Sequence, residues 1–322
     1  MTADKQVIRE SAASTSGMCL GGIGTGGVQL WPDGRFYHWN LVNSRPWAAA
    51  GGKPGAHGIQ PIQPAVGAAD FLLRVQRPGA RPQFRWLFCG HGAVPAIGHF
   101  WRHHKFYFAK SFPEIEYRAE HPFVYLNYVD DELPVRVSLR AWTPFIPRDV
   151  RNSSLPGCFL DFDVENRISG ELNISLCWIQ QNLAGYAADT VEQEHAFFER
   201  DGAVGIRMRG SLADPDHDSS GCMSIWGIPS EDQSVSRVAA HPHLANLSWP
   251  LYATGNLEGP LTAGVPSREE INNPPSAKAP NKGWLCLQQA VGGKAKAALR
   301  CGLSWFFPNH RTIRGTRIGH MY

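Results

Sequence analysis

The segment CFLDFDVEN (residues 158–166) decides the fold class. Cys158, Leu160, Phe162 and Val164 alternate with polar or outward-pointing positions. Successive side chains of a β-strand point to opposite faces of its sheet, so this pattern predicts a strand with one apolar and one solvated face. The same period recurs along the chain, and we therefore expect strands to dominate the structure. Segments with this alternation are VRVSLRAW (135–142) and LNISLCWI (172–179).

Turn signals between these segments predict how the strands pair. The turn RISGE (167–171) predicts an antiparallel hairpin between 158–166 and 172–179. Pro78-Gly79 predicts a hairpin between DFLLRVQ (70–76) and QFRWLFC (83–89), and DDELP (130–134) predicts one between FVYLNYV (123–129) and VRVSLRAW. Further strands are expected late in the chain, and DTVEQEHAFFE (189–199) is the one segment expected to be helical. The predicted fold is all-β: a large two-sheet antiparallel β-sandwich, supersandwich-like, with long loops and at most one or two short helices.

Composition limits the classes of function. The chain has 322 residues, is 43% hydrophobic and carries a formal charge of +3, which is too small to indicate a nucleic-acid partner. Seven scattered cysteines without a C-x-x-C pair favour reduced thiols. The N-terminus lacks a secretory signal and no apolar run reaches membrane-spanning length, so we expect a cytoplasmic protein, with peripheral membrane association left open.

The glycine-rich stretch LGGIGTGGVQLWPDGRF (20–36) contains Gly22, Gly24 and Gly27 at G-x-G-x-x-G spacing. A dinucleotide-binding loop with this spacing must follow a buried strand and open a helix. Here the turn signal Pro32-Asp33-Gly34 follows between two β-type runs, so the context excludes the cofactor interpretation. The glycines are expected to supply left-handed backbone or close packing. A loop lining a sugar-binding cleft is the alternative.

Other residues that suggest chemistry have simpler explanations. Asp161, Asp163 and Glu165 have a spacing that suits paired glycosidase carboxylates, but they point the same way along one strand, as on a solvated face. Six histidines lack the spacing of metal ligands. We therefore expect no catalytic residue, no cofactor and no metal site in this chain. The histidines are His91, His99, His103, His104, His241 and His243.

Three blocks of sequence, taken in order, resemble one known domain. They are LGGIGTGGVQLWPDGRFYHWNLVNSRPW (20–47), the block that begins with FPEIEY (112–117) and ends with CFLDFDVEN (158–166), and LSWFFPN (303–309). The most specific part of the second block is PFIPRDVRNSSLP (144–156). This order is similar to the N-terminal domain of glycoside hydrolase family 116, which includes the non-lysosomal glucosylceramidases of the bile acid β-glucosidase type and bacterial β-glucosidases. The resemblance extends from about Gly17 to Tyr322 and implies a β-sandwich, in agreement with the periodicity.

The resemblance also implies that the catalytic residues lie in a domain other than this one. In the family, a following (α/α)₆ domain carries the nucleophilic Glu and the acid/base Asp of a retaining hydrolase. We expect residues 1–16 to form a flexible arm and residues 17–322 to form the β-sandwich, ending at the connection to a catalytic domain that this chain lacks. The expected partners are that domain and the β-glucoside or glucosylceramide substrate of the parent enzyme.

Two functions remain open at this point. The first is a non-catalytic N-terminal portion that scaffolds the catalytic domain, and the second is a stand-alone carbohydrate-binding sandwich with exposed aromatic residues. Candidates for docking or for the rim of the catalytic cleft are the long loop 255–283 and five single residues. These are Gly22, Gly24, Gly26, Arg45 and Trp47.

Overall fold

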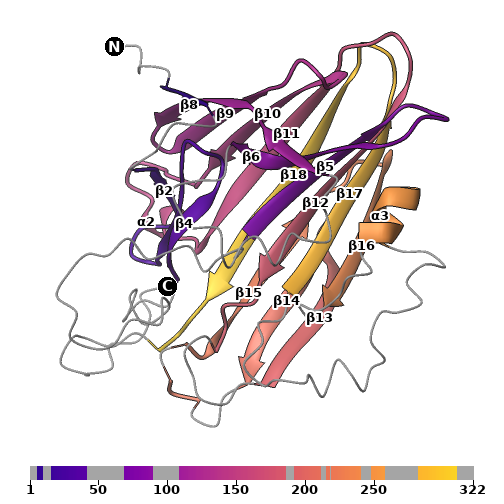
Figure 1. Cartoon of the computed structure of the whole chain (residues 1–322). Coiled ribbons are helices and arrows are strands. Elements are labelled where there is room, and N and C mark those ends of the chain that lie inside the picture. The colour runs from indigo at the N-terminus through magenta and orange to yellow at the C-terminus, as the bar shows by residue number, and fades with distance from the viewer. Residues whose placement is uncertain are drawn as a thin grey trace.

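Two stacked β-sheets make up most of the molecule (Figure 1). The computed structural model describes residues 6–9, 16–41, 69–89, 109–185, 192–211, 215–217, 219–240, 248–257 and 282–309. In these residues the prediction of an all-β sandwich with at most two short helices is confirmed. The helices are α2 (Val150–Ser153) and α3 (Ser248–Thr254), and neither is long or apolar enough to cross a membrane.

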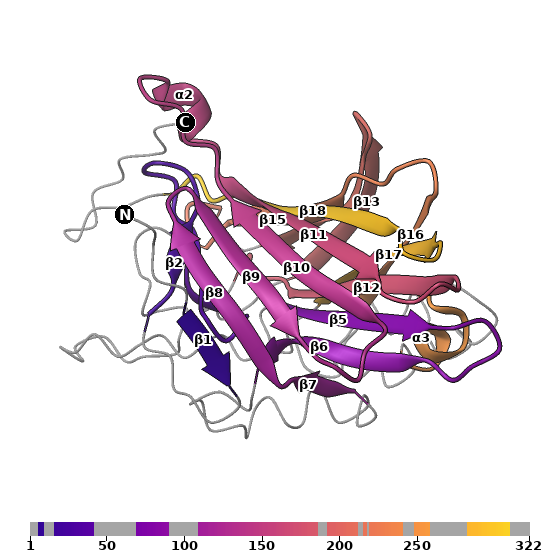
Figure 2. The same cartoon turned by 90° about the horizontal axis from the view of Figure 1, so that it is seen from above.

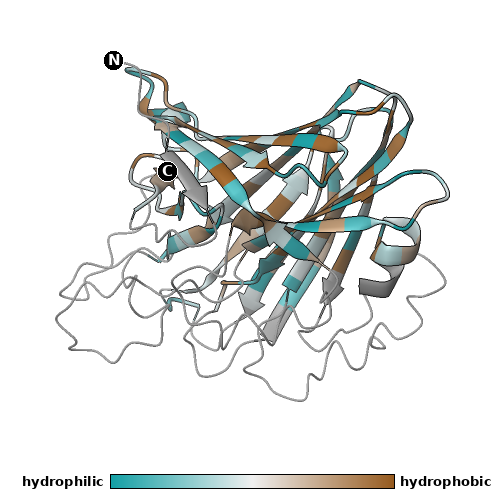
Figure 3. Ribbon diagram, turned by 45° about the horizontal axis from the view of Figure 1, so that its top comes forward, coloured by the Kyte–Doolittle hydropathy of each residue, from teal (hydrophilic) through white to brown (hydrophobic). Residues whose placement is uncertain are grey.

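The larger sheet has nine strands, and every neighbouring pair in it is antiparallel (Figure 2). Hydrophobic and hydrophilic residues alternate along these strands (Figure 3), as expected for a sheet with one buried face. The strands, in spatial order, are β1 (Gln6–Arg9), β8 (Glu114–Glu120), β9 (Phe123–Val129), β10 (Val135–Trp142), β11 (Gly157–Asn166), β18 (Lys296–Phe306), β15 (Gly221–Gly227), β14 (Ala203–Ser211) and β13 (Glu192–Arg200).

The second sheet has six strands, and a third, small sheet has three. In both sheets the pairing is antiparallel except between β6 and β7. The six strands, in spatial order, are β16 (Gln233–Ala240), β17 (Lys282–Val291), β12 (Leu172–Gln181), β5 (Ala69–Gln76), β6 (Gln83–Cys89) and β7 (Lys110–Phe112). The small sheet consists of β2 (Met18–Leu20), β3 (Gly27–Leu30) and β4 (Phe36–Asn40).

Two predicted hairpins are confirmed and one is wrong. β5 pairs with β6 and β9 pairs with β10, as their turns predict. β11 and β12 do not pair, because β11 lies in the nine-stranded sheet and β12 in the six-stranded sheet. The turn between them crosses the sandwich. It is held by the buried Asn166 amide, which donates to the carbonyls of Gly170 (2.8 Å), Val291 (3.1 Å) and Gly292 (3.0 Å).

The helix predicted over 189–199 is also wrong. Residues 192–200 form β13, which pairs with β14 from Glu192–Ser211 to Arg200–Ala203. A short polar segment with weak helical periodicity becomes an edge strand because pairing with β14 satisfies its backbone groups. Residues 189–191 lie outside the described part of the chain.

The main core lies between the two large sheets. Phe162 of β11 packs against Phe71 of β5, with ring centroids 5.1 Å apart, and Phe71 in turn contacts Trp178 of β12 at 4.8 Å. Phe162 and Trp178 are almost completely buried. The contact between Phe162 and Phe71 links the two sheets directly, so the apolar faces that alternation predicts do meet each other.

A second, smaller core explains why β12 is buried on both faces. The outer face of the six-stranded sheet packs Leu72, Cys177 and Cys286 beneath α3, whose Leu251 is completely buried. Side chains from the sheet also bind the carbonyls at the C-terminal end of α3. Arg74 Nη2 donates to Tyr252 (3.2 Å) and the Gln288 amide donates to Thr254 (3.0 Å). A cation at this end of a helix is favourable.

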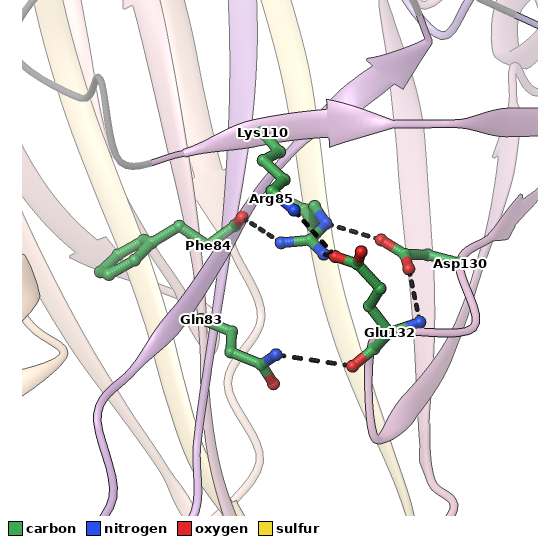
Figure 4. Close-up of polar contacts among 6 residues, drawn as sticks. All are labelled: Gln83, Phe84, Arg85, Lys110, Asp130 and Glu132. Atoms are coloured by element: carbon green, nitrogen blue, oxygen red, sulfur yellow. Dashed lines mark hydrogen bonds and ion pairs between the residues drawn. The ribbon is translucent and has the colours of Figure 1, made fainter.

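A buried arginine ties the second sheet to the first (Figure 4). Arg85 of β6 is 4% exposed, and its Nε lies 2.6 Å from Asp130 Oδ2 in the turn after β9. Its Nη2 lies 2.8 Å from Glu132 Oε2, which also binds Lys110 of β7 at 3.0 Å. The hydrogen bond from Lys110, with the charges of Lys110 and Arg85, lowers the pKa of Glu132. The acidic turn DDE (130–132) is therefore part of a structural ion network.

All seven cysteines are free thiols. Five of them are buried, and burial raises the pKa of Cys158 to about 12. The thiolate is the reactive form of cysteine, so such a side chain serves as a small apolar group in the core.

Candidate functional site

The glycine-rich stretch forms the connection between β2 and β3 of the small sheet. These strands are antiparallel and no helix follows β3, so the strand–loop–helix context of a dinucleotide-binding loop does not occur here. Gly24 (φ 73°) and Gly26 (φ 83°) have left-handed backbone, which other residues adopt only with strain. The expectation that glycines serve the backbone conformation holds at both positions.

Gly22 is required for a different reason, which is close packing. A Cβ atom at this position would lie 2.5 Å from the Leu155 carbonyl oxygen and 2.6 Å from the carbonyl carbon of Ser154. The next residue, Ile23, donates its backbone N–H to the Ser153 carbonyl at 2.8 Å. The glycine-rich loop therefore lies directly on the segment PFIPRDVRNSSLP, and two blocks far apart in the sequence form one surface.

The Thr143 hydroxyl joins this contact to the large sheet. It accepts a hydrogen bond from Gly21 N–H (2.8 Å) and donates one to the Gly157 carbonyl (3.0 Å). Thr143 is buried, and both hydrogen bonds are partly shielded from water. The hydroxyl thereby fixes the glycine-rich loop to the end of β10 and the start of β11.

Local hydrogen bonds fix the shape of the segment between β10 and β11. The Asp149 carboxylate accepts a hydrogen bond from Asn152 N–H (3.0 Å) and thereby caps α2. This bond and a second one from the Asn152 side-chain amide lower the pKa of Asp149. The buried Ser153 hydroxyl accepts from Ile146 N–H (2.8 Å) and donates to the Ile146 carbonyl (3.1 Å). The segment is therefore a structured loop on a rigid sheet end.

β18 ends beside these two loops. Trp305 donates its ring N–H to the Thr25 carbonyl (2.7 Å) and its backbone N–H to the Pro156 carbonyl (3.0 Å). The end of β18 thus lies against both loops. We call residues 21–26 and 144–156 together the apolar corner.

Large hydrophobic side chains gather on this corner. Eight of them are classed as exposed in the described residues, and five of the eight lie here with 46–68% of their surface exposed. Single exposed apolar residues are normal, but a cluster of this kind marks an interaction site. The five are Ile23, Phe145, Ile146, Val150 and Leu155.

The corner is also positively charged at its edge. Arg148 and Arg151 are exposed, and neither forms an ion pair within the described part of the chain. The neighbouring Asp149 carboxylate is engaged as the cap of α2. An apolar surface with a basic edge can bind a partner that is apolar with an acidic edge.

The acidic residues of β11 lie on the outer face of the nine-stranded sheet, as expected. Asp161 accepts from Arg140 Nη2 (2.7 Å) and from the Trp142 ring N–H (3.0 Å). Glu165 lies 3.5 Å from Arg136 and 3.6 Å from Lys296. These carboxylates bind neighbouring cations on one face of the sheet. They do not face each other from opposite sides of a cleft, as paired glycosidase carboxylates would.

Sequence reasoning located part of this corner and missed the rest. Gly22, Gly24 and Gly26 lie in it, whereas Arg45, Trp47 and the six histidines lie outside the described residues. Of the loop 255–283, residues 258–281 also lie outside them, and residues 255–257 follow α3. The predicted end of this loop is wrong, because Lys282 and Gly283 pair with β12 and β16 as the start of β17. Phe145, Ile146, Val150 and Leu155 were missed as a cluster, although four large apolar residues in a proline-bounded segment are a usable signal.

A family model matches most of the chain. The model described as "beta-glucosidase 2, glycosyl-hydrolase family 116 N-term" matches residues 17–322. The match includes the glycine-rich loop, the segment 144–156 and β18, the three parts that meet at the apolar corner. The match covers nearly the whole chain, and the chain therefore belongs to the family of N-terminal domains of glycosyl hydrolase family 116.

Proposed function

We propose that this chain is the non-catalytic scaffold of a family 116 glycoside hydrolase and that its apolar corner docks on the catalytic domain. An N-terminal domain of this family implies a separate catalytic domain. The scaffold fixes the position of that domain and covers apolar surface that would otherwise face water.

The observation that carries the proposal is the apolar corner itself. Its five exposed hydrophobic side chains lie on loops held by hydrogen bonds to the hydroxyls of the buried residues Thr143 and Ser153, so little conformational entropy is lost when a partner covers them. The corner also lies against the end of β18.

The finer parts of the proposal concern the parent enzyme. We assign it β-glucosides as substrates, with glucosylceramide and other glycosphingolipids among them, and a cytoplasmic location. Support comes from the resemblance of blocks 20–47 and 144–156 to the glucosylceramidases.

Co-expression tests the proposal. The whole chain is co-expressed with the catalytic domain of a family 116 β-glucosidase in place of that enzyme's own N-terminal domain, and the affinity of the purified pair is measured by titration calorimetry. We expect Ile146→Asp to weaken association at least about 30-fold, since a charge forced into an apolar interface costs roughly 2 kcal/mol or more.

A matched control is available on the same sheet. Phe197 is exposed to a similar extent as Ile146 (54% and 47%), but it alternates with Phe198 along β13 and lies beside Arg237 of β16, away from the corner and from the outer face of the sheet. Phe197→Asp is expected to leave the affinity within about two-fold of wild type. Equal losses in both variants, or no association of the wild-type chain, would refute docking through the corner.

A further inference from the structure

A row of aromatic side chains crosses the outer face of the nine-stranded sheet. Residues directly opposite each other on successive strands share a face of the sheet, and the register runs Phe123, Trp142, Phe159, Gly302, Trp226, Gly205 and Phe198. The strands involved lie side by side in the order β9, β10, β11, β18, β15, β14 and β13 (Figure 2). Their five aromatic residues, which we call the aromatic row, are partly exposed.

The two glycines explain how the row stays continuous. A Cβ atom at Gly302 would lie 2.1 Å from Cζ2 of Trp226, and one at Gly205 would lie 2.6 Å from Cζ of Phe198. Each ring therefore lies over the neighbouring strand, in the space that a side chain would occupy. The rings of Trp226 and Phe198 therefore fill the two positions at which glycine would otherwise leave a gap in the aromatic row.

Contacts between the rings favour a protein partner over a sugar. Trp142 and Phe159 stack with centroids 4.4 Å apart and planes 13° apart, so each covers one face of the other. The ring N–H of Trp142 is already bonded to Asp161. A sugar platform needs open ring faces, whereas a row of packed rings with satisfied polar groups suits an apolar protein surface.

The aromatic row continues into the apolar corner. The Phe145 ring of the corner makes an edge contact with His121 at 5.0 Å, and His121 is two residues before Phe123. Trp142 is followed directly by Thr143, which holds the glycine-rich loop. Both surfaces thus meet at the end of β10, and one partner of domain size can cover them together.

Two arginines extend the positive charge of the corner along the row. Arg207 and Arg209 of β14 alternate with Gly205 and therefore point to the same outer face, where both are exposed. In the described residues neither forms an ion pair. Together with Arg148 and Arg151 they form a basic border around apolar surface.

We propose that the aromatic row is a second part of the docking surface and that the catalytic domain lies across the outer face of the nine-stranded sheet. This inference rests on the proposed function. It specifies a partner surface that is apolar in the middle and carries carboxylates opposite Arg207 and Arg209.

The test uses charge reversal in the same co-expressed pair. Arg207→Glu/Arg209→Glu is expected to weaken association about 10-fold or more at low salt, with a smaller difference in 0.5 M NaCl, because exposed charge pairs are screened. Arg77→Glu/Arg81→Glu is the matched control: it makes the same change in net charge at the exposed β5–β6 turn and is expected to change the affinity less than about two-fold.

A second variant tests the apolar part. Trp226→Ala is expected to weaken association about 10-fold or more while far-ultraviolet circular dichroism remains that of wild type. Wild-type affinity in both the Arg and the Trp variants would overturn this inference and leave docking through the corner intact. If the wild-type chain does not associate at all, the proposed function fails and this inference with it. The wild-type chain is also tested for binding of the soluble β-glucan laminarin. If it binds laminarin and Trp226→Ala abolishes that binding, the aromatic row is a carbohydrate site and this inference is overturned.

Discussion

Arg85→Met is expected to lower the free energy of unfolding by about 3–5 kcal/mol, the range for removing one partner of a buried ion pair. Methionine keeps much of the volume of the arginine side chain, so the loss of stability comes from removing the positive charge that pairs with Asp130. Asp130 is 8% exposed and would keep its hydrogen bond from Glu132 N–H but lose the guanidinium at 2.6 Å. Urea unfolding followed by tryptophan fluorescence measures the change.

Two further variants test whether the stability is lost because the Arg85–Asp130 ion pair is buried. Arg118→Met removes an exposed arginine that lies 3.6 Å from Glu120, and it is expected to cost less than about 1 kcal/mol. Arg85→Met/Asp130→Leu removes both buried charges and is expected to recover part of the stability. A loss below about 1 kcal/mol for Arg85→Met would contradict the role given to this ion pair.

Phe162→Ala is expected to cost about 3–5 kcal/mol, because it opens a cavity between the two large sheets. Phe162 is 1% exposed and contacts Phe71 of the opposite sheet. Close packing leaves neighbouring side chains little freedom to fill the space. Chemical denaturation monitored by circular dichroism measures this loss.

Phe145→Ala is the matched control for that experiment. It removes the same side chain from the apolar corner, where Phe145 is 46% exposed and touches His121, so we expect a loss of less than about 1 kcal/mol. The comparison separates residues that hold the sandwich together from residues that we propose contact a partner. Similar losses in the two variants would mean that the corner is part of the core.

Alternation predicted the strands well because it is a local property. Cys158, Leu160 and Phe162 face the core as the period requires. The assignment of strands to sheets depends on contacts far apart in the sequence. For this reason the hairpin predicted at the turn 167–171 was wrong. In β12 the residues Cys177 and Ile179 are apolar on the face opposite Trp178. This second apolar face indicates a strand covered on both sides, and it distinguishes β12 from β11.

The candidate site was predictable only in part. Glycine spacing identified the loop at 21–26, because backbone conformation and close approach depend on residue type at single positions. Exposure of Ile146 and Val150 depends on how loops from distant parts of the chain meet, and no periodicity reports it. The aromatic row likewise depends on register across strands far apart in sequence, such as β11 and β18.

The account depends most on where the catalytic domain covers this chain, and hydrogen–deuterium exchange of the whole chain measures that directly. With the co-expressed catalytic domain bound, we expect slower amide exchange at residues 22–25 and 144–155 and across β14 and β15, relative to the chain alone. Exchange on the outer face of the six-stranded sheet, around α3, is expected to stay unchanged. Protection around α3 with no change at the apolar corner would contradict the account.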